Sequence, residues 1–255
     1  MTPSLPAEFL RAPIAHRALH DIADHRPENS RAAICAAVKA GYGVEVDLQL
    51  TADDRAMVFH DYDMTRLTGQ PGPIRQTTCA QAQATSLLHG DDGIPTLDEV
   101  LELIGGKVPL LIELKDQDGA MGTDIGSLEH DTVRALRGYE GPVALMSFNP
   151  NSVAELARLA PHLPRGLVTC SYDPKVELLP QKVCDHLREI PDFDRVGAAF
   201  ISHEAEDLSR PRVAELKARG VPILCWTVRS PGQEAEARKV ADNVTFEGYL
   251  AAHPG

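Results

Sequence analysis

The apolar and polar positions of the chain alternate between two kinds of segment. Short apolar runs of strand length begin near residues 13, 44, 109, 143, 165, 198, 221 and 243. Between them we expect helices over residues 30–41, 97–106, 150–160, 178–190, 209–219 and 231–240, and one more ending near residue 137. Eight strands that alternate with helices or long connections predict an α/β fold, the (β/α)8 TIM barrel. A doubly wound open sheet is the alternative, but no GxGxxG motif follows the first strand.

The stretch at residues 43–61 has the most informative pattern. Alternate residues of a strand share a face, so Glu45 and Asp47 point the same way, with apolar residues between them. The polar break that follows is too short for a parallel crossover, so Ala56–His60 must return antiparallel, as a hairpin. A turn centred on residues 52 and 53 puts the last residue of this segment opposite roughly position 45. The alternative is a surface hairpin whose charged side chains are simply solvated.

The segment after this hairpin differs from the rest of the chain. Residues Asp61–Pro95 are rich in Gly, Pro and Thr and have weak periodicity, so we expect an irregular excursion with a short helix. We therefore predict an insertion after the second strand, over about residues 51–95. No linker or low-complexity segment interrupts the 255 residues, of which 43% are hydrophobic, so residues 1–255 are interpreted as a single domain.

Polar residues interrupt the apolar strands near their carboxyl ends. In a barrel these ends meet at one rim, where active sites lie. Several independent strands thus deliver polar or ionisable groups to the predicted rim, namely His16, Arg17, Glu45, Asp47, Glu113, Lys115, Ser147, His203, Trp226 and Thr227.

The residue types at this rim, with the hairpin histidine, suit phosphoryl-ester chemistry. Carboxylate oxygens are ligands that Mg²⁺ or Ca²⁺ prefers, histidines transfer protons near neutral pH, and fixed cations bind phosphate oxygens. The groups are the carboxylates Glu45, Asp47 and Glu113, the histidines His16 and His60, and the cations Arg17 and Lys115. Each also has a structural interpretation: a strand-end histidine is more often structural than catalytic, and Glu113 with Lys115 could form a simple ion pair.

The composition limits the kinds of binding partner and the cellular compartment that we expect for this chain. A net charge of −12 argues against general binding of nucleic acid or anionic membranes, although it leaves room for a local phosphate pocket. The five scattered cysteines lack CxxC spacing and predict reduced thiols rather than a disulfide framework or a zinc site. No apolar leader segment and no run of membrane-spanning length is visible, so we expect a cytoplasmic protein without a membrane span.

Six short motifs occur in order along the chain. They are His16-Arg17, PENS at residues 27–30, the stretch at 43–61, LLIELK at 110–115, SF at 147–148 and CWTV at 225–228. Each is weak alone, but as an ordered set from about residue 13 to 246 they resemble the glycerophosphodiester phosphodiesterase family. The resemblance implies a TIM barrel with an insertion after the second strand. It also implies a hydrolase of lipid and glycerol metabolism whose small-molecule substrate, a glycerophosphodiester, is cleaved to glycerol 3-phosphate and an alcohol.

The same resemblance implies a role for each rim residue. It gives a divalent cation, Mg²⁺ or Ca²⁺, as cofactor, and a route in which the neighbouring glycerol hydroxyl attacks phosphorus and water then opens the cyclic phosphate. The implied metal ligands are Glu45, Asp47 and Glu113, the general acid and base are His16 and His60, and the phosphate-binding residues are Arg17 and Lys115.

Two aromatic residues at strand ends are candidates for substrate binding. Trp226, the only tryptophan, and Phe148 are interpreted as an apolar wall for the glycerol or alcohol portion, although core packing explains Trp226 about equally well. Asn29 is expected to orient a ligand or a histidine, or to serve only as the cap of the first helix.

Four departures from the family pattern bear on substrate preference. Ala18 replaces the usual glycine after His-Arg, so that turn lacks a glycine's free access to positive φ. The loop over residues 18–26 is longer than usual and is predicted to be mainly solvated. Asp54 replaces the glycine of the hairpin turn and tolerates the left-handed region better than most residues. After Thr245, a common aspartate is replaced by Phe246 and Glu247.

Three other functions compete with the leading hypothesis. One is a non-catalytic sensor of phosphodiesters or metal with the same fold, and another is activity on lysophospholipids of the phospholipase D type. The third is an isomerase or aldolase on a TIM barrel, which fits the three carboxylates less well and offers no evident Schiff-base lysine besides Lys115. The oligomeric state stays open.

Overall fold

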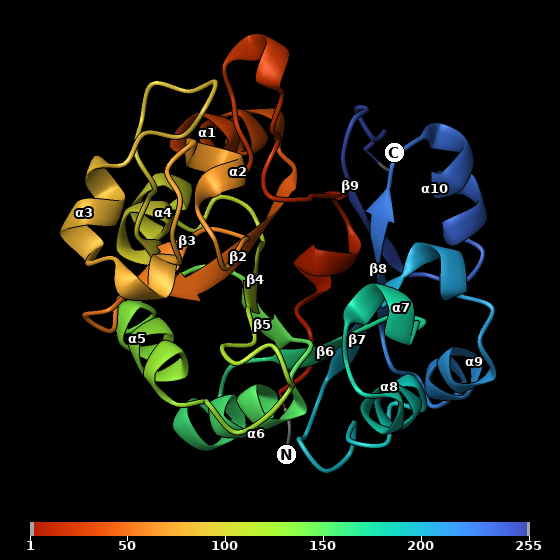
Figure 1. Cartoon of the computed structure of the whole chain (residues 1–255). Helices are drawn as coiled ribbons and strands as arrows, with labels where there is room; N and C mark the ends of the chain where they lie inside the picture. The colour runs from red at the N-terminus through yellow and green to blue at the C-terminus, as the bar shows by residue number, and fades with distance from the viewer. Residues whose placement is uncertain (1–2, 254–255) are drawn as a thin grey trace.

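The parallel strands close into a barrel. The computed structural model describes residues 3–253 (Figure 1). Each strand pairs in parallel with its neighbours, and β1 closes the ring by pairing with both β2 and β9. In order around the ring, the strands are β1 (Ile14–Ala15), β2 (Gly43–Leu50), β4 (Leu110–Leu114), β5 (Val143–Ser147), β6 (Arg165–Thr169), β7 (Phe200–Glu204), β8 (Ile223–Val228) and β9 (Asn243–Phe246). The predicted TIM barrel is confirmed, with eight parallel strands where the apolar runs placed them.

Helices surround the strands, as Figure 1 shows. Thr96 caps its helix through a reciprocal capping box with Glu99, and Gly41 ends the first helix at a φ of 77°. The helices between or after the strands are α1 (Arg31–Ala40), α4 (Leu97–Ile104), α5 (Ser127–Ala135), α6 (Pro150–Leu159), α7 (Pro174–Glu177), α8 (Gln181–Arg188), α9 (Pro211–Ala218) and α10 (Pro231–Ala237). No helix within residues 3–253 is long and apolar enough to cross a membrane.

The predicted helix over residues 178–190 is wrong at its amino end. Leu178 lies in the left-handed region at a φ of 57°, outside the helical range, and ends α7. Pro180 follows two residues later and biases Leu179 away from the helical region, so α8 begins only at residue 181. Two short helices therefore replace one.

The lumen of the barrel is filled from the amino-terminal ends of the strands. Phe200 and Phe9, the latter from the short helix η1 (Ala7–Leu10), are fully buried in the lumen cluster. The Asn243 amide donates to the carbonyl oxygens of Phe9 and Ala12, at 2.7 Å each. A Cβ atom at Gly166 would lie 2.5 Å from the Phe200 ring, so only glycine leaves room for that ring. The lumen is closed below and opens only at the carboxyl ends of the strands.

The predicted insertion follows β2 and has a core of its own. It contains the hairpin strand β3 (Ala56–Val58), α2 (Thr65–Thr68), a 3-10 helix (Ile74–Gln76) and α3 (Cys79–Ala84). Another 3-10 helix, Ile22–Asp24, lies earlier in the chain, between β1 and α1. Within the insertion, the helices pack around a cluster that includes Met57, Phe59 and Ile74. In Figure 1 these segments, orange to yellow, lie together beside α4.

The hairpin register differs from the expectation by one residue. Leu48 pairs with Val58, so a continued ladder would put position 60 opposite Val46 rather than Glu45. That register would turn His60 away from the lumen. The pairing of β3 with β2 instead ends at Val58, two residues earlier than expected. Beyond that residue the chain no longer follows β2, and the His60 side chain points to the rim. Asp54 takes the left-handed conformation expected at the turn, with a φ of 56°.

Candidate active site

A cavity of about 230 Å³ lies at the carboxyl ends of the strands. Asp47 lies just behind its wall and contacts it through Lys115. The other eight predicted site residues line it directly: His16, Arg17, Glu45, His60, Glu113, Lys115, Phe148 and Trp226. Segments far apart in the sequence thus bring all nine residues to one place.

Three carboxylates form the centre of the site. One oxygen from each of Glu45, Asp47 and Glu113 lies within 4.8 Å of the other two, and all three side chains are buried. Glu45 Oε2 accepts a hydrogen bond from the Arg17 backbone N–H at 2.8 Å. Glu45 Oε1 is buried and has no hydrogen-bond partner among residues 3–253. These carboxylate oxygens, one of which accepts no hydrogen bond, form a cluster that fits a hard divalent cation such as Mg²⁺ or Ca²⁺.

Lys115 balances part of this negative charge. Its ammonium lies 2.8 Å from Asp47 Oδ1 and 2.6 Å from Glu113 Oε1. Burial alone would raise the pKa of Asp47, but Lys115, His60 and Arg17 together outweigh it and hold that pKa well below its usual range. Burial raises the pKa of Glu45, and the neighbouring Asp47 and Glu113 charges add to the rise. Burial would lower the pKa of Lys115, but the two carboxylates raise it, so the ammonium stays charged.

Each candidate catalytic histidine is held by a carboxylate. His16 Nδ1 lies 2.7 Å from Glu247 Oε2, and Arg229 Nε donates to the other Glu247 oxygen at 2.7 Å. His60 Nδ1 lies 2.7 Å from Asp61 Oδ1. With Nδ1 engaged by the carboxylate, Nε2 of each ring is the nitrogen left for the cavity. Burial lowers the pKa of His16, and the hydrogen bond to Glu247 opposes that change.

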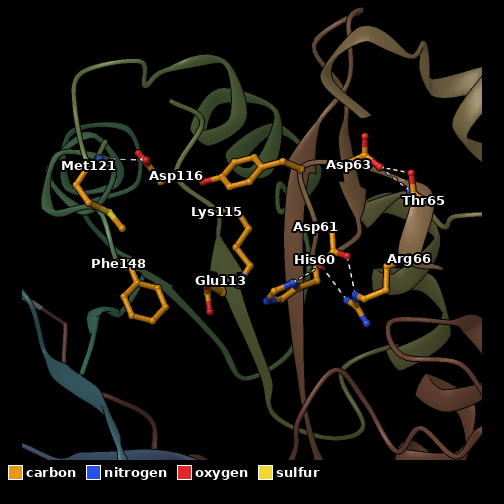
Figure 2. Close-up of a pocket in the computed structure, with 11 residues that line it drawn as sticks. His60, Asp61, Asp63, Thr65, Arg66, Glu113, Lys115, Asp116, Met121 and Phe148 are labelled. Atoms are coloured by element: carbon orange, nitrogen blue, oxygen red, sulfur yellow. Dashed lines mark hydrogen bonds and ion pairs between the residues drawn. The ribbon is translucent and has the colours of Figure 1, made fainter. Parts of the chain in front are cut away.

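A wider pocket of about 680 Å³ adjoins the inner cavity (Figure 2). His60, Glu113, Lys115 and Phe148 line both, so the two spaces lie side by side. In Figure 2, Met121 and Phe148 lie on one side of this outer pocket and His60, Asp61 and Arg66 on the other. The site therefore consists of a small inner cavity and a wider outer pocket.

Comparison with known proteins places the chain among phosphodiesterases. Residues 16–248 match the model of the glycerophosphoryl diester phosphodiesterase family. The chain belongs to this family. It is 33% identical over 151 residues to a glycerophosphodiester phosphodiesterase of Caldanaerobacter subterraneus subsp. tengcongensis, a match that covers 56% of this chain and 61% of that relative. It is 27% identical over 221 residues to a glycerophosphodiester phosphodiesterase of Bacillus subtilis, covering 78% and 70% of the two chains.

The fold is also similar to solved structures. An Oleispira antarctica phosphodiesterase, solved with the product sn-glycerol-3-phosphate, superposes with a TM-score of 0.73 at 24% identity, covering 94% of this chain and 93% of that one. A glycerophosphodiester phosphodiesterase of Thermotoga maritima gives a TM-score of 0.68 at 20% identity, with coverages of 92% and 94%. These likenesses support the family's barrel fold.

Two residues expected at the rim do not reach this phosphodiesterase site. The Ser147 hydroxyl donates to the Leu114 carbonyl oxygen at 2.7 Å. His203 is fully buried outside the lumen, with Nδ1 2.8 Å from Thr169 Oγ1. The cause is strand alternation, because on β7 the lumen-facing residue is Ser202, which lines the cavity.

Four charged residues that position the site had no assigned role in the sequence. Asp61 follows His60 directly and was the easiest to suspect. Glu28 accepts from both Arg17 Nη1 and Arg66, and its only signal was its place in PENS. Arg229 gave no signal. Glu247 was noted only as a departure from the family pattern after Thr245, and 231 residues separate it from His16.

Asn29 and the neighbouring turn support the carboxylates from behind. The helix cap is Ser30, and the Asn29 amide instead donates to Asp47 Oδ2 at 2.9 Å. Arg17 and Ala18 both adopt positive φ, of 52° and 65°. The turn therefore uses the left-handed region without the family's glycine, held by the hydrogen bond from the Ala18 N–H to the Glu45 carbonyl oxygen at 3.0 Å.

The loop over residues 18–26 is mostly exposed, as expected for a solvated segment. Residues 21–25 face solvent. The ends of the loop are less exposed: Ala18 is buried, and His20 Nε2 lies 3.6 Å from Glu247 Oε2. All five cysteines are free.

Proposed function

We propose that this chain hydrolyses glycerophosphodiesters to glycerol 3-phosphate and an alcohol, by general acid–base catalysis with a divalent cation. The observation that carries the proposal is the pair of carboxylate-held histidines, His16 with Glu247 and His60 with Asp61, around one cluster of buried acids and cations. Proton donors, proton acceptors and phosphate-binding charges in one cavity are the requirements of phosphodiester cleavage.

The cation would be held by Glu45, Asp47 and Glu113. The unpartnered Glu45 Oε1 supports this assignment, and the all-oxygen donor set favours Mg²⁺ or Ca²⁺ over softer metals. When bound, the cation would neutralise charge that develops on the phosphoryl oxygens.

The two histidines would divide the proton transfers. Burial lowers the pKa of His16, which favours its neutral form, so we assign it as the base that takes the proton of the neighbouring glycerol hydroxyl. His60 lines the outer pocket as well as the inner cavity, so we assign it as the acid that protonates the leaving alcohol oxygen. Attack of the hydroxyl on phosphorus and loss of the alcohol give a cyclic phosphate. Water then opens it with the two roles reversed.

Arg17 and Lys115 would bind the phosphate oxygens. Arg17 Nε is buried and lies 3.6 Å from Asp47 Oδ2, but it makes no hydrogen bond within the described part of the chain, so its N–H is available to a ligand. Arg17 Nη1 is fixed by Glu28 at 2.8 Å, which orients the guanidinium group. Lys115 contributes a point charge beside the cation ligands.

The two spaces favour one orientation of the diester. The inner cavity suits the small glycerol half, with the Phe148 and Trp226 rings, 5.5 Å apart between centroids, as its apolar wall. The open outer pocket suits the leaving alcohol, whose size can vary. An acyl chain on the glycerol has little room in the inner cavity, so unacylated diesters are favoured over lysophospholipids.

A turnover assay tests the proposal and separates it from a non-catalytic sensor. Glycerophosphocholine and glycerophosphoethanolamine are incubated with the protein, and released glycerol 3-phosphate is measured with Mg²⁺ or Ca²⁺ and with EDTA. We expect turnover with a cation and its loss in EDTA. Binding of either diester without product would favour the sensor, and full turnover of the metal-free protein would remove the cation from the proposal.

A further inference from the structure

The wall of the inner cavity opposite the carboxylates carries hydroxyl groups. Ser202 on β7 and Thr245 on β9 flank Trp226 on β8, and all three line the cavity. Their place in the lumen follows from strand register, because Ser202 pairs with Val168 and Leu224, and Thr245 pairs with Ile14. Those three apolar partners belong to the buried lumen cluster.

Both hydroxyls are buried without a partner. Ser202 is 0% exposed and Thr245 is 1% exposed, and neither oxygen has a hydrogen-bond partner among residues 3–253. Buried hydroxyls normally find a partner, since leaving one unsatisfied costs free energy. The contrast with Ser147, whose hydroxyl donates to a carbonyl oxygen at 2.7 Å, shows that this barrel can satisfy such a group. Two unpartnered hydroxyls lining one cavity therefore point to a ligand with hydroxyl groups.

The chemistry of this wall matches a small polyol and not a phosphate. The phosphate-binding cations Arg17 and Lys115 belong to the opposite wall, and Arg229 is engaged by Glu247 at 2.7 Å. The indole N–H of Trp226 donates to the Ser202 carbonyl oxygen at 3.0 Å, which fixes the ring beside the hydroxyl. A carbon skeleton can pack on the ring while its hydroxyls reach the two side-chain oxygens.

We propose that Ser202 and Thr245 bind the hydroxyl groups of the glycerol half of the substrate. The two side chains then determine the preference for a glycerol-type polyol on the retained side of the scissile bond. This inference rests on the proposed function, because it takes the glycerol half of a diester as the occupant of the inner cavity.

The test compares two ligands that differ only in hydroxyl groups. Binding of sn-glycerol 3-phosphate and of n-propyl phosphate is measured by calorimetry with a saturating divalent cation. Wild-type protein should bind glycerol 3-phosphate at least tenfold more tightly. Ser202→Ala and Thr245→Val should each weaken glycerol 3-phosphate binding about two- to tenfold, the usual worth of one hydrogen bond, and leave propyl phosphate binding unchanged. Thr245→Ser should retain the wild-type preference.

Thermal unfolding of the free proteins supplies a second readout. Removing an unsatisfied buried hydroxyl, as in Ser202→Ala, or replacing it by a methyl group, as in Thr245→Val, should leave Tm unchanged or raise it, while binding weakens. Ser152→Ala is the matched control, since the Ser152 hydroxyl on α6 is also buried and unpartnered but lies outside the cavity. It should change neither ligand's affinity.

The outcomes separate this inference from the proposed function. Equal weakening of both ligands, or unchanged glycerol 3-phosphate binding in both cavity variants, would overturn the hydroxyl inference, as would a wild-type protein that does not distinguish the ligands. Absence of glycerophosphodiester turnover in the wild-type protein would instead overturn the proposed function.

Discussion

The two walls of the inner cavity differ in how their buried polar groups are paired. The wall built on β1, β2 and β4 carries carboxylates and cations that pair with one another, and Glu45 Oε1 and Arg17 Nε are its unpartnered atoms among the described residues. The wall built on β7, β8 and β9 offers neutral hydroxyls that no residue in the range 3–253 satisfies. An unpaired buried charge costs far more than an unpaired hydroxyl, so the protein itself pairs most of the charges. The neutral wall can be left for a ligand to complete.

Removing either histidine from the charged wall should have the largest effect. His16→Ala and His60→Ala are each expected to lower kcat by about 10²–10⁴-fold, the usual contribution of a positioned acid or base. KM and Tm should change little, which steady-state kinetics and thermal unfolding will measure. The exposed His130 provides a control, since His130→Ala should leave both parameters intact. Wild-type turnover in either variant removes that histidine from the proposed mechanism.

Removing the ammonium between the acids tests how the charged wall is balanced. Lys115→Met leaves Asp47 and Glu113 buried without their shared cation, which should cost about 3–5 kcal/mol of unfolding free energy in metal-free buffer. Added Mg²⁺ or Ca²⁺ should restore more stability in this variant than in the wild type, as denaturant titration with and without the cation will show. Lys107→Met, at an exposed position, is the control. Equal cation responses would mean that Lys115 and the cation do not share these acids.

Glu247 is expected to tune the pH profile through His16. Burial lowers the pKa of His16 and Arg17 lowers it further, while Glu247 and Asp47 oppose this change. A base works in its neutral form, so activity is lost as the pH falls through this pKa. Glu247→Gln should lower the pKa again and move the acidic limb of kcat/KM to lower pH. Loss of ring orientation should also reduce kcat about 10–100-fold, by analogy with other carboxylate–histidine pairs.

A control and a contrary result define this pH experiment. Glu206→Gln changes an exposed carboxylate away from the site and should leave the profile unchanged. An acidic limb that stays in place in the Glu247 variant would show that His16 is not the group that titrates there.

The smallest expected effect concerns the turn behind the charged wall. Ala18→Gly should relieve the positive φ of 65° and stabilise the protein by about 1 kcal/mol, or about 2–4 °C in Tm. Ala36→Gly, inside α1, should have the opposite sign and cost about 0.5–1 kcal/mol. Differential scanning calorimetry distinguishes the two. A destabilised Ala18 variant would show that the surrounding contacts, and not glycine-like freedom, determine this turn.

The sequence predicted the charged wall much better than the neutral one. Ionisable residues inside apolar strands are conspicuous, and the rule that barrel strands end at one rim brought Glu45, Asp47 and Glu113 together before any coordinates were known. Serine and threonine in a strand carry no such signal. The prediction that His203 rather than Ser202 faces the site was also wrong. A shift of one residue along β7 moves a side chain from the lumen to the exterior of the barrel.

The parts that the sequence could not predict depend on long-range geometry. Glu247 reaches His16 only because β1 and β9 are neighbours when the barrel closes. The orientation of His60 depends on where the ladder of β3 ends, which a turn motif does not specify to one residue. The predicted helix boundary was wrong where a single residue, Leu178, adopts an unusual φ value.

The filled amino-terminal end of the barrel bears on the order in which the products leave the site. Phe200 and Phe9 fill the lumen below the cavity, so ligands enter and leave at the carboxyl ends of the strands. With the glycerol half seated in the inner cavity, the alcohol must depart before glycerol 3-phosphate can follow. Glycerol 3-phosphate should therefore be the last product released and a competitive inhibitor against the diester, whereas the free alcohol should not compete with it.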